Sequence, residues 1–231
     1  MPARRFVIEL LARSPLSARV HRLRFAARPP FEWQAGQYLV IVAAEGQALS
    51  LPYSIASASD PAKPGEFELA VAIQAGADVM DTLAIGAELE VEGPAGTFTW
   101  QPAPSPAALL VGAGTGIAPL RALIQAELAR ESEIRLWLLA GHRAPEDVLF
   151  AADFAQLARE HSRFHFVPTL SGVSSGWLGR KGRVQAQLLE AVSSLGALDA
   201  YVCGRLEMVS DVVAQLIAHG VPAARIRSEG F

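Results

Sequence analysis

The chain has 231 residues, of which 19% are charged, and its formal net charge is -3. This length favours two domains of ordinary size, and the slight negative charge argues against a nucleic-acid partner. A single cysteine excludes an intrachain disulfide and a multi-cysteine cluster, and the five histidines lack metal-ligand spacing, so no metal is expected. No apolar run approaches the roughly 18 residues of a spanning helix, and the N-terminus lacks a signal-peptide core. We therefore expect a soluble, cytoplasmic protein without membrane contact.

Residues 1–102 are predicted to form an antiparallel β-barrel. Short strand-like runs follow one another with Gly, Pro and Asp between them: FVIEL, VHRLRF, QYLVIV, YSIAS, FELAVAI and ELEVEG. Evenly spaced short strands with little helix are typical of a small barrel or sandwich. One short helix is expected at Asp78–Leu83. The segment QPAPSPA, residues 101–107, contains three prolines and forms a stiff connector.

Residues 103–231 are predicted to form an α/β nucleotide-binding domain. Strand-like runs at AALLV, IRLWLLA, FHFVPTL, DAYVC and ARIRSEG alternate with segments of helical periodicity. The expected helices cover residues 117–130, 151–159, 184–192 and 206–219. Alternation of this kind gives a parallel sheet that is covered by helices on both faces.

A glycine-rich turn, VGAGTGIAPL, directly follows the first strand of the second domain. Gly112, Gly114 and Gly116 allow a tight turn and a close approach of backbone amides to a pyrophosphate. Thr115 adds a hydroxyl, and the helix expected from Ile117 directs its positive end at the same place. The spacing G-x-G-x-G differs from the usual dinucleotide fingerprint. The alternative is a strand-to-helix turn that binds no ligand.

A second motif, LPYSIAS at residues 51–57, places a proline in a strand of the barrel. A barrel with a Pro-Tyr-Ser strand, followed by a G-x-G-T-G α/β domain, resembles the ferredoxin–NADP reductase superfamily. GPAGTF, YVCGRLEM and IRSEGF resemble further motifs of that family. Within the superfamily, VMDTL, GWLGRKGRV and GRLEM are most similar to the bacterial NAD(P)H–flavin oxidoreductases, the flavin reductases.

The resemblance implies a flavin site on the barrel. Its contacts would be Pro52, Tyr53, Ser54, Ile55 and the C-terminal Phe231. Tyr53 would lie against the ring or the ribityl chain. The hydroxyl of Ser54, one of two catalytic candidates, would reach flavin N5, the atom that accepts hydride. The alternatives are a barrel-wall role for Tyr53, a locally satisfied hydroxyl for Ser54 and an ordinary strand end for Phe231.

The resemblance also implies a nicotinamide dinucleotide site on the α/β domain. The implied contacts are Gly112, Gly114, Thr115, Gly116, Arg143, Cys203, Gly204 and Arg205. Cys203, the second catalytic candidate, would face the nicotinamide C4 and shape the hydride-transfer geometry. The alternatives are a buried, inert thiol for Cys203 and a solvated loop residue for Arg143.

One position departs from the family pattern. Leu51 stands where the family has an arginine that neutralises a flavin phosphate, and leucine makes no charge-assisted hydrogen bond. Either the flavin (FAD, FMN or riboflavin) is a loosely held substrate that is recognised mainly by its ring, or another arginine takes this role. Arg22 and Arg24, which share one face of their strand, are the candidates, with solvated surface charges as the alternative.

The sequence thus predicts an NAD(P)H-dependent flavin reductase that transfers hydride from NADH or NADPH to flavin N5. The first alternative is an electron-transfer component with tightly bound FAD that serves a flavin-dependent oxygenase or another redox protein. The second is a regulatory module that binds nucleotide or flavin without turnover. The hydroxyl-rich stretch TLSGVSSGW, which contains no arginine, favours NADH over NADPH.

Overall fold

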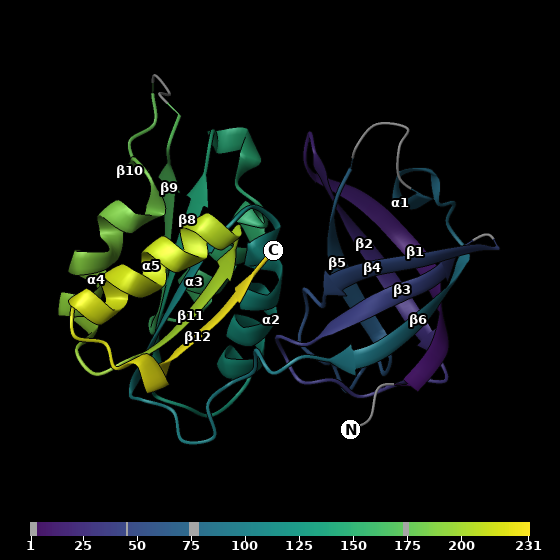
Figure 1. Cartoon of the computed structure of the whole chain (residues 1–231), viewed down its shortest axis with the longest axis horizontal. Coiled ribbons are helices and arrows are strands. Elements are labelled where there is room, and N and C mark those ends of the chain that lie inside the picture. Colours follow the sequence, from purple (N-terminus) through teal and green to yellow (C-terminus); the bar gives the residue numbers. More distant parts are fainter. Residues whose placement is uncertain (1–3, 45, 74–78, 173–175) are drawn as a thin grey trace.

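The structure, a computed structural model, describes residues 4–44, 46–73, 79–172 and 176–231. Two lobes lie side by side, and helix α2 of the second lobe lies at the boundary between them (Figure 1). The N-terminal lobe is an antiparallel six-stranded curled sheet, and the C-terminal lobe is a parallel six-stranded sheet with helices. Both parts of the predicted fold class are therefore confirmed.

The barrel sheet has the strand order β4-β3-β6-β1-β2-β5. Its elements are β1 (Arg4–Ser17), β2 (Val20–Arg28), β3 (Tyr38–Ala44), β4 (Gln47–Ser54), β5 (Glu66–Ala72), β6 (Glu88–Ala95) and the short helix α1 (Val79–Thr82). Alternate side chains point inward from these strands and fill a core that includes Ile8, Phe25, Leu39 and Val91. Asp78, the expected start of the short helix, lies outside the described residues.

Pro52 lies in β4, which stands at one end of the strand order and is paired along its length only with β3. An end strand tolerates proline because the missing N–H need not meet a neighbouring strand. The predicted bounds of the strand YSIAS, residues 53–57, are wrong, because β4 starts at Gln47 and ends at Ser54. Beyond this point an isolated bridge between Ile55 and Leu69 closes the sheet toward β5.

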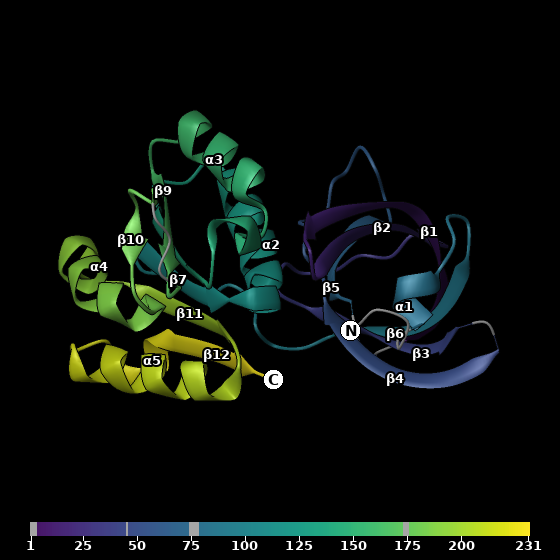
Figure 2. The same ribbon diagram turned by 90° about the horizontal axis from the view of Figure 1, so that it is seen from above.

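The parallel sheet has the strand order β10-β9-β8-β7-β11-β12. Its strands are β7 (Ala107–Ala113), β8 (Arg135–His142), β9 (Phe164–Leu170), β10 (Arg180–Lys181), β11 (Asp199–Gly204) and β12 (Ile226–Gly230). Helices α2 (Ile117–Leu128) and α3 (Ala151–Glu160) cover one face, and α4 (Leu188–Leu195) and α5 (Leu206–Ala218) cover the other (Figure 2). The order reverses at β7 and β11, so ligands are expected beyond the carboxyl ends of these two strands.

The structure differs from the predicted elements of this domain in two places. β10 pairs with β9 but has only two residues, too few for a hydrophobic period to reveal it. Residues Val184–Gln187 form a 3-10 turn, so α4 starts at Leu188 rather than at Val184. No helix in the described part of the chain is long and apolar enough to cross a membrane.

Candidate active site

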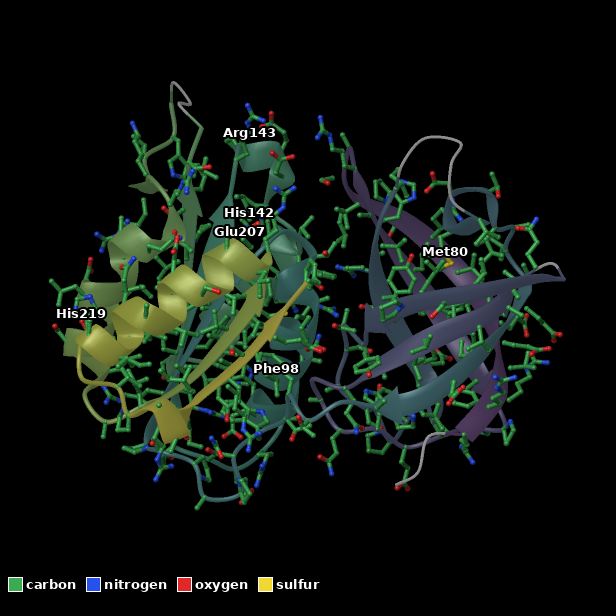
Figure 3. All side chains as sticks on the ribbon, in the orientation of Figure 1. Met80, Phe98, His142, Arg143, Glu207 and His219 are labelled. Carbon is green, nitrogen blue, oxygen red and sulfur yellow. The ribbon has the colours of Figure 1, made fainter. Side chains whose placement is uncertain are left out.

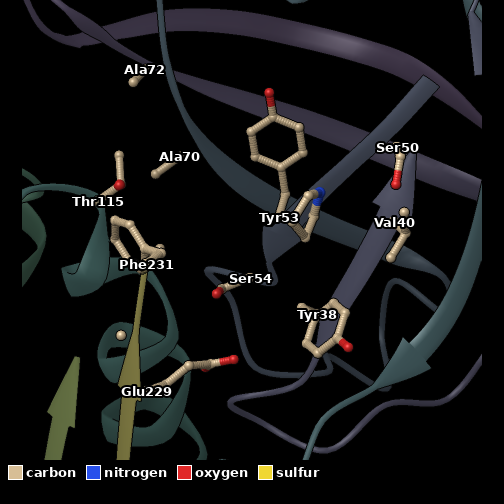
Figure 4. A pocket seen from close by; sticks show the side chains of 13 residues that line it. Tyr38, Val40, Ser50, Tyr53, Ser54, Ala70, Ala72, Thr115, Glu229 and Phe231 are labelled. Atoms are coloured by element: carbon tan, nitrogen blue, oxygen red, sulfur yellow. The ribbon is translucent and has the colours of Figure 1, made fainter. Parts of the chain in front are cut away.

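A cleft of about 490 Å³ lies where the barrel meets the α/β domain. Its lining comes from both domains and includes Tyr38, Pro52, Tyr53, Ser54, Thr115, Glu229 and Phe231. Figure 4 shows Phe231 and Tyr53 on opposite sides of the cleft, with Ser54 between them. The volume lies in the range of small-molecule sites, about 300–1,000 Å³. Four residues of the predicted flavin site therefore share this space with Thr115, which among the described lining residues is the one from the predicted nicotinamide site.

Three of the four residues of the LPYS motif line this cleft. Pro52 and Ser54 line it, together with the residues of β3 with which they pair. Tyr53 also lines it and packs against the barrel core. Leu51 packs against the same core and is not among the described lining residues. The side chain of Ile55 is completely buried in that core, so only its backbone remains for the flavin contact that the resemblance implies.

Glycine occurs in the GAGTG turn for two different physical reasons. A Cβ on Gly116 would lie 2.4 Å from the carbonyl oxygen of Cys203, and a Cβ on Gly112 would lie 2.6 Å from Cδ1 of Leu120. Gly116 needs to be glycine because backbone atoms of β11 approach it, whereas Gly112 faces the ends of side chains of α2 that can shift. Gly114 has a φ of +56° and no described atom within 4 Å of its Cβ position, so its backbone faces open space.

Helix α2 directs its N-terminus at the cleft. It begins at Ile117, directly after the 3-10 turn Gly114–Gly116, and in the described structure no side chain caps its first turn. Thr115 and Ala118, on either side of this start, line the cleft. Unpaired backbone N–H groups and the helix dipole favour an anionic group at such a place. The predicted contact of this turn with a pyrophosphate stays a prediction, and this geometry supports it.

Cys203 lies behind the cleft rather than in its lining. Its side chain is completely buried in the core between α2 and the parallel sheet. Burial raises the pKa of the thiol, and the nearby Glu229 carboxylate raises it further, so Cys203 is protonated at neutral pH. The next residue, Gly204, accepts a hydrogen bond of 3.1 Å from the amide of Phe231. The predicted role of Cys203 in positioning the nicotinamide therefore stays a prediction.

Sequence reasoning missed Glu229 as a site residue. Its side chain lines the cleft, and its Oε2 is buried without a hydrogen-bond partner in the described structure. Burial raises the pKa of this carboxyl above its ordinary value of 4.5. The sequence holds a signal, because Glu229 lies near the end of a predicted strand, two residues before Phe231, so the two side chains point to the same side where the extended chain continues. A titratable group with a shifted pKa in a cleft is typical of functional sites.

Replacement of Glu229 by glutamine is expected to raise the free energy of unfolding at pH 8. The pKa of this carboxyl is higher in the folded than in the unfolded chain, so its ionised form opposes folding. The advantage of Glu229→Gln over the wild type should shrink as the pH falls through the folded-state pKa and vanish below about 4.5. Urea unfolding of the flavin-free chain at a series of pH values measures the difference.

Glu88→Gln is the matched control for this experiment, because Glu88 is exposed on the barrel. It removes one carboxylate that water already surrounds. An equal gain in stability from Glu88→Gln, or no gain from Glu229→Gln, would contradict the view that burial destabilises the ionised form of Glu229.

Arg143 and Arg205 lie at the carboxyl edge of the parallel sheet, outside the lining of the cleft. Arg143 is exposed after β8, and its carbonyl accepts a hydrogen bond of 2.8 Å from Gly172, which follows β9. Arg205 is exposed and directly precedes α5. Figure 3 shows Arg143 and Glu207, in the first turn of α5, at the same end of the domain. Both arginines stay predicted nucleotide contacts, and residues 173–175 of TLSGVSSGW lie outside the described residues.

Arg22 and Arg24 do not line the cleft that contains Ser54. Arg22 donates a hydrogen bond of 2.8 Å to Oδ2 of Asp153 in the α/β domain. Arg24 lines a separate cleft of about 550 Å³, together with Lys63. The structure therefore does not support the suggestion that these two arginines replace the phosphate-binding arginine of the family.

The residues of the cleft fit a flavin ring and a nicotinamide ring. Both rings have flat apolar faces and polar edges, so aromatic walls and edge hydroxyls are their natural partners. Tyr53 and Phe231 provide aromatic faces, and Ser54 and Thr115 provide hydroxyls. In the described part of the chain, no group of three or more His, Cys, Asp or Glu side chains is arranged to hold a metal ion.

Comparisons with known proteins agree with this arrangement. The family model of the oxidoreductase FAD-binding domain matches residues 7–100, and that of the oxidoreductase NAD-binding domain matches residues 110–214. A ferredoxin–NADP reductase B of Sorangium cellulosum is 35% identical over 98% of this chain and 97% of its own length. An NAD(P)H-flavin reductase of Aliivibrio fischeri is 28% identical over 84% of each of the two chains.

Solved structures show the same two-domain arrangement. The crystal structure of a cytochrome P450 reductase from Amycolatopsis has a TM-score of 0.88 with this chain at 29% identity. It covers 100% of this chain, which corresponds to 70% of that protein's chain. These matches leave the alternative of a regulatory module without support. The chain therefore belongs to the ferredoxin reductase-like oxidoreductases, which combine an FAD-binding barrel with an NAD-binding α/β domain and use a flavin together with NAD(P)H.

Proposed function

We propose that this chain transfers hydride from a reduced nicotinamide dinucleotide to N5 of a flavin in the cleft between its domains. One observation carries the proposal: Ser54 of the barrel motif and Thr115 of the glycine-rich turn line the same cleft. Hydride transfer needs the donor and acceptor atoms about 3–3.5 Å apart, and a shared cleft is the arrangement that permits this.

The chain supplies binding and alignment in this proposal. A bound nicotinamide and a bound flavin supply the hydride donor and acceptor, so no base or nucleophile of the protein is required. Tyr53 and Phe231 cover ring faces and exclude water, and the Ser54 hydroxyl donates a hydrogen bond at the N5 edge of the flavin. Thr115 and the first turn of α2 hold the dinucleotide on the opposite wall.

The flavin in this proposal is an exchangeable substrate. Leu51 takes the place of the family's arginine, and no lysine or arginine is found among the described residues that line the cleft. A flavin phosphate then lacks charge-assisted hydrogen bonds, each worth about 1.5–3 kcal/mol, that would hold it between turnovers. The similarity to an NAD(P)H-flavin reductase over most of both chains supports this choice.

A second candidate is a reductase that keeps its FAD and passes electrons to a partner protein. The observation that favours it is the 35% identity to a ferredoxin–NADP reductase B over nearly the whole of both chains. One similar protein with a solved structure is a cytochrome P450 reductase. The partner would then be a redox protein or an oxygenase.

Gel filtration of the purified chain, followed by assays of NADH and NADPH oxidation, distinguishes the two candidates. A free-flavin reductase should elute colourless and oxidise the reduced dinucleotide only when FMN, FAD or riboflavin is added. Yellow protein that retains FAD through the column and reduces a ferredoxin would favour the second candidate. Absence of oxidation with either dinucleotide and every flavin would contradict both.

Replacement of Leu51 by arginine is expected to tighten FMN and FAD binding. Leu51 and Tyr53 share the face of β4 that packs against the barrel core, and Tyr53 also lines the cleft. Because position 51 is only half-buried, the long arginine side chain can extend past the core toward the cleft. A gain of about 1.5–3 kcal/mol from a phosphate contact corresponds to about 10- to 150-fold in Kd. Quenching of flavin fluorescence on titration with protein measures the Kd.

Riboflavin is the control ligand for Leu51→Arg, because it has no phosphate. Its Kd should stay unchanged, and the FMN complex should become more sensitive to salt, since an exposed ion pair is screened. Equal changes for riboflavin and FMN would mean that position 51 does not face the phosphate, and the argument for a loosely held flavin would then fail.

A further inference from the structure

Two arginines and two carboxylates connect the domains in a network at their boundary. Arg121 of α2 donates to the carbonyl oxygen of Ala56 at 2.7 Å and to Glu68 at 2.8 Å, both in the barrel. In the opposite direction, Arg22 of the barrel donates to Asp153 of α3 at 2.8 Å. Arg121 also donates to Asp153, from Nη2 at 2.7 Å and from Nε at 3.1 Å. One carboxylate therefore joins the two arginines across the boundary.

Arg121 is the centre of this network, and only 5% of it is exposed. Loss of this buried charge is costly, because Glu68 loses its close counter-charge, Asp153 keeps only Arg22, and the Ala56 carbonyl loses its donor. The ring of Phe150 lies beside the network, with its centre 4.5 Å from the guanidinium carbon of Arg121 and 5.0 Å from that of Arg22. Phe150 has a φ of +55°, a strained conformation that persists only where the surrounding contacts enforce it.

The network is connected directly to both walls of the cleft. Ala56 follows Ser54 by two residues, on the barrel side. Arg121 lies one helical turn beyond Ile117, where α2 begins just after Thr115. Arg121 therefore links the two walls, although it is not among the described residues that line this cleft.

We propose that Arg121 is a positioning residue that sets the approach of the nicotinamide site to the flavin site, an inference that rests on the proposed hydride transfer. Arg121 contacts neither ring. It holds the two domains at one separation and one orientation, through partners that belong to both. A misplacement of about 1 Å between reacting groups can cost about 10²-fold in rate. Arg121 thus affects turnover more than flavin affinity, because all of the proposed flavin contacts except Phe231 lie on the barrel.

The first test compares the kinetics of Arg121→Gln with those of the wild type. We expect kcat for flavin reduction to fall about 10²-fold, with a much smaller change in the flavin Kd in a fluorescence titration. Arg163→Gln is the matched control, because Arg163 is also largely buried and donates to the carbonyl oxygens of Glu127 and Ile134, all within the α/β domain. Its kcat should stay close to that of the wild type.

The second test reports domain orientation without any turnover. Glu88 on the barrel and Asp211 on α5 are exposed, so each can be replaced by a cysteine that carries a spin label. Pulsed electron paramagnetic resonance then measures the distribution of distances between the two domains. The native Cys203 is completely buried and is not expected to react with the label. Arg121→Gln should broaden or shift the distribution, whereas Arg163→Gln should leave it as in the wild type.

Three results would overturn the proposal: an unchanged kcat in Arg121→Gln, an equal loss of kcat in Arg163→Gln, or label distances that Arg121→Gln does not alter. A wild-type chain that oxidises neither NADH nor NADPH would overturn the proposed function instead, and the label distances would still decide the role of Arg121. If Arg121→Gln does not fold, Asp153→Asn removes the shared charge at a more exposed side chain, and the same outcomes apply.

Discussion

Replacement of Ser54 by alanine is expected to lower kcat about 10²-fold, with little change in the KM for the nicotinamide dinucleotide. The hydroxyl lies in the cleft between the aromatic wall of the barrel and the C-terminal strand. A hydrogen bond that strengthens as charge develops on the flavin stabilises the transition state more than the ground state. Steady-state kinetics with saturating flavin measure both constants.

Ser50→Ala is the matched control for Ser54→Ala. Ser50 also lies in β4 and also lines the cleft. It precedes Ser54 by four residues in the strand and lies further from the α/β domain (Figure 4). Its removal should leave kcat nearly unchanged. If Ser54→Ala keeps the wild-type kcat, the Ser54 hydroxyl is an ordinary strand side chain and makes no contact in the transition state.

Replacement of Gly116 by alanine is expected to destabilise the chain by about 3 kcal/mol and to weaken nicotinamide binding. The added Cβ would lie 2.4 Å from the carbonyl oxygen of Cys203 and 2.7 Å from Cα of Gly204. Both are backbone atoms, so the start of α2 has to move away from the end of β11. Because this start carries Thr115 and the unpaired amides of the helix, the same movement disrupts the proposed dinucleotide site.

Gly114→Ala separates this steric effect from the loss of a glycine as such. Gly114 has a φ of +56° but open space around its Cβ position, so alanine should cost only about 1 kcal/mol of backbone strain. Urea unfolding measures both stabilities, and titration with the oxidised dinucleotide measures both affinities. Equal losses of stability for the two variants would contradict the tight packing of Gly116 against β11.

The sequence by itself determines the order and type of most elements, because side-chain periodicity is a local property. Alternation of strand and helix beyond Ala107 predicts the parallel sheet, and the glycine-rich turn predicts where α2 begins, at Ile117. The same reasoning places Pro52 at a strand position where a hydrogen bond to a neighbouring strand is not needed. In the structure, β4 lies at the end of its sheet. These features depend on residues that are close together in the chain.

Only the tertiary structure decides which faces are buried and which charges meet. Alternation shows that residues share a face but not that this face meets the core. The complete burial of Ile55 therefore could not be predicted, and for Cys203 the sequence could only offer burial as one of two alternatives. Arg121 is buried because the barrel covers α2, and the pKa of Glu229 is raised because packing at the cleft removes water from it. Desolvation depends on how the two domains pack together, and no local pattern of side chains encodes that contact.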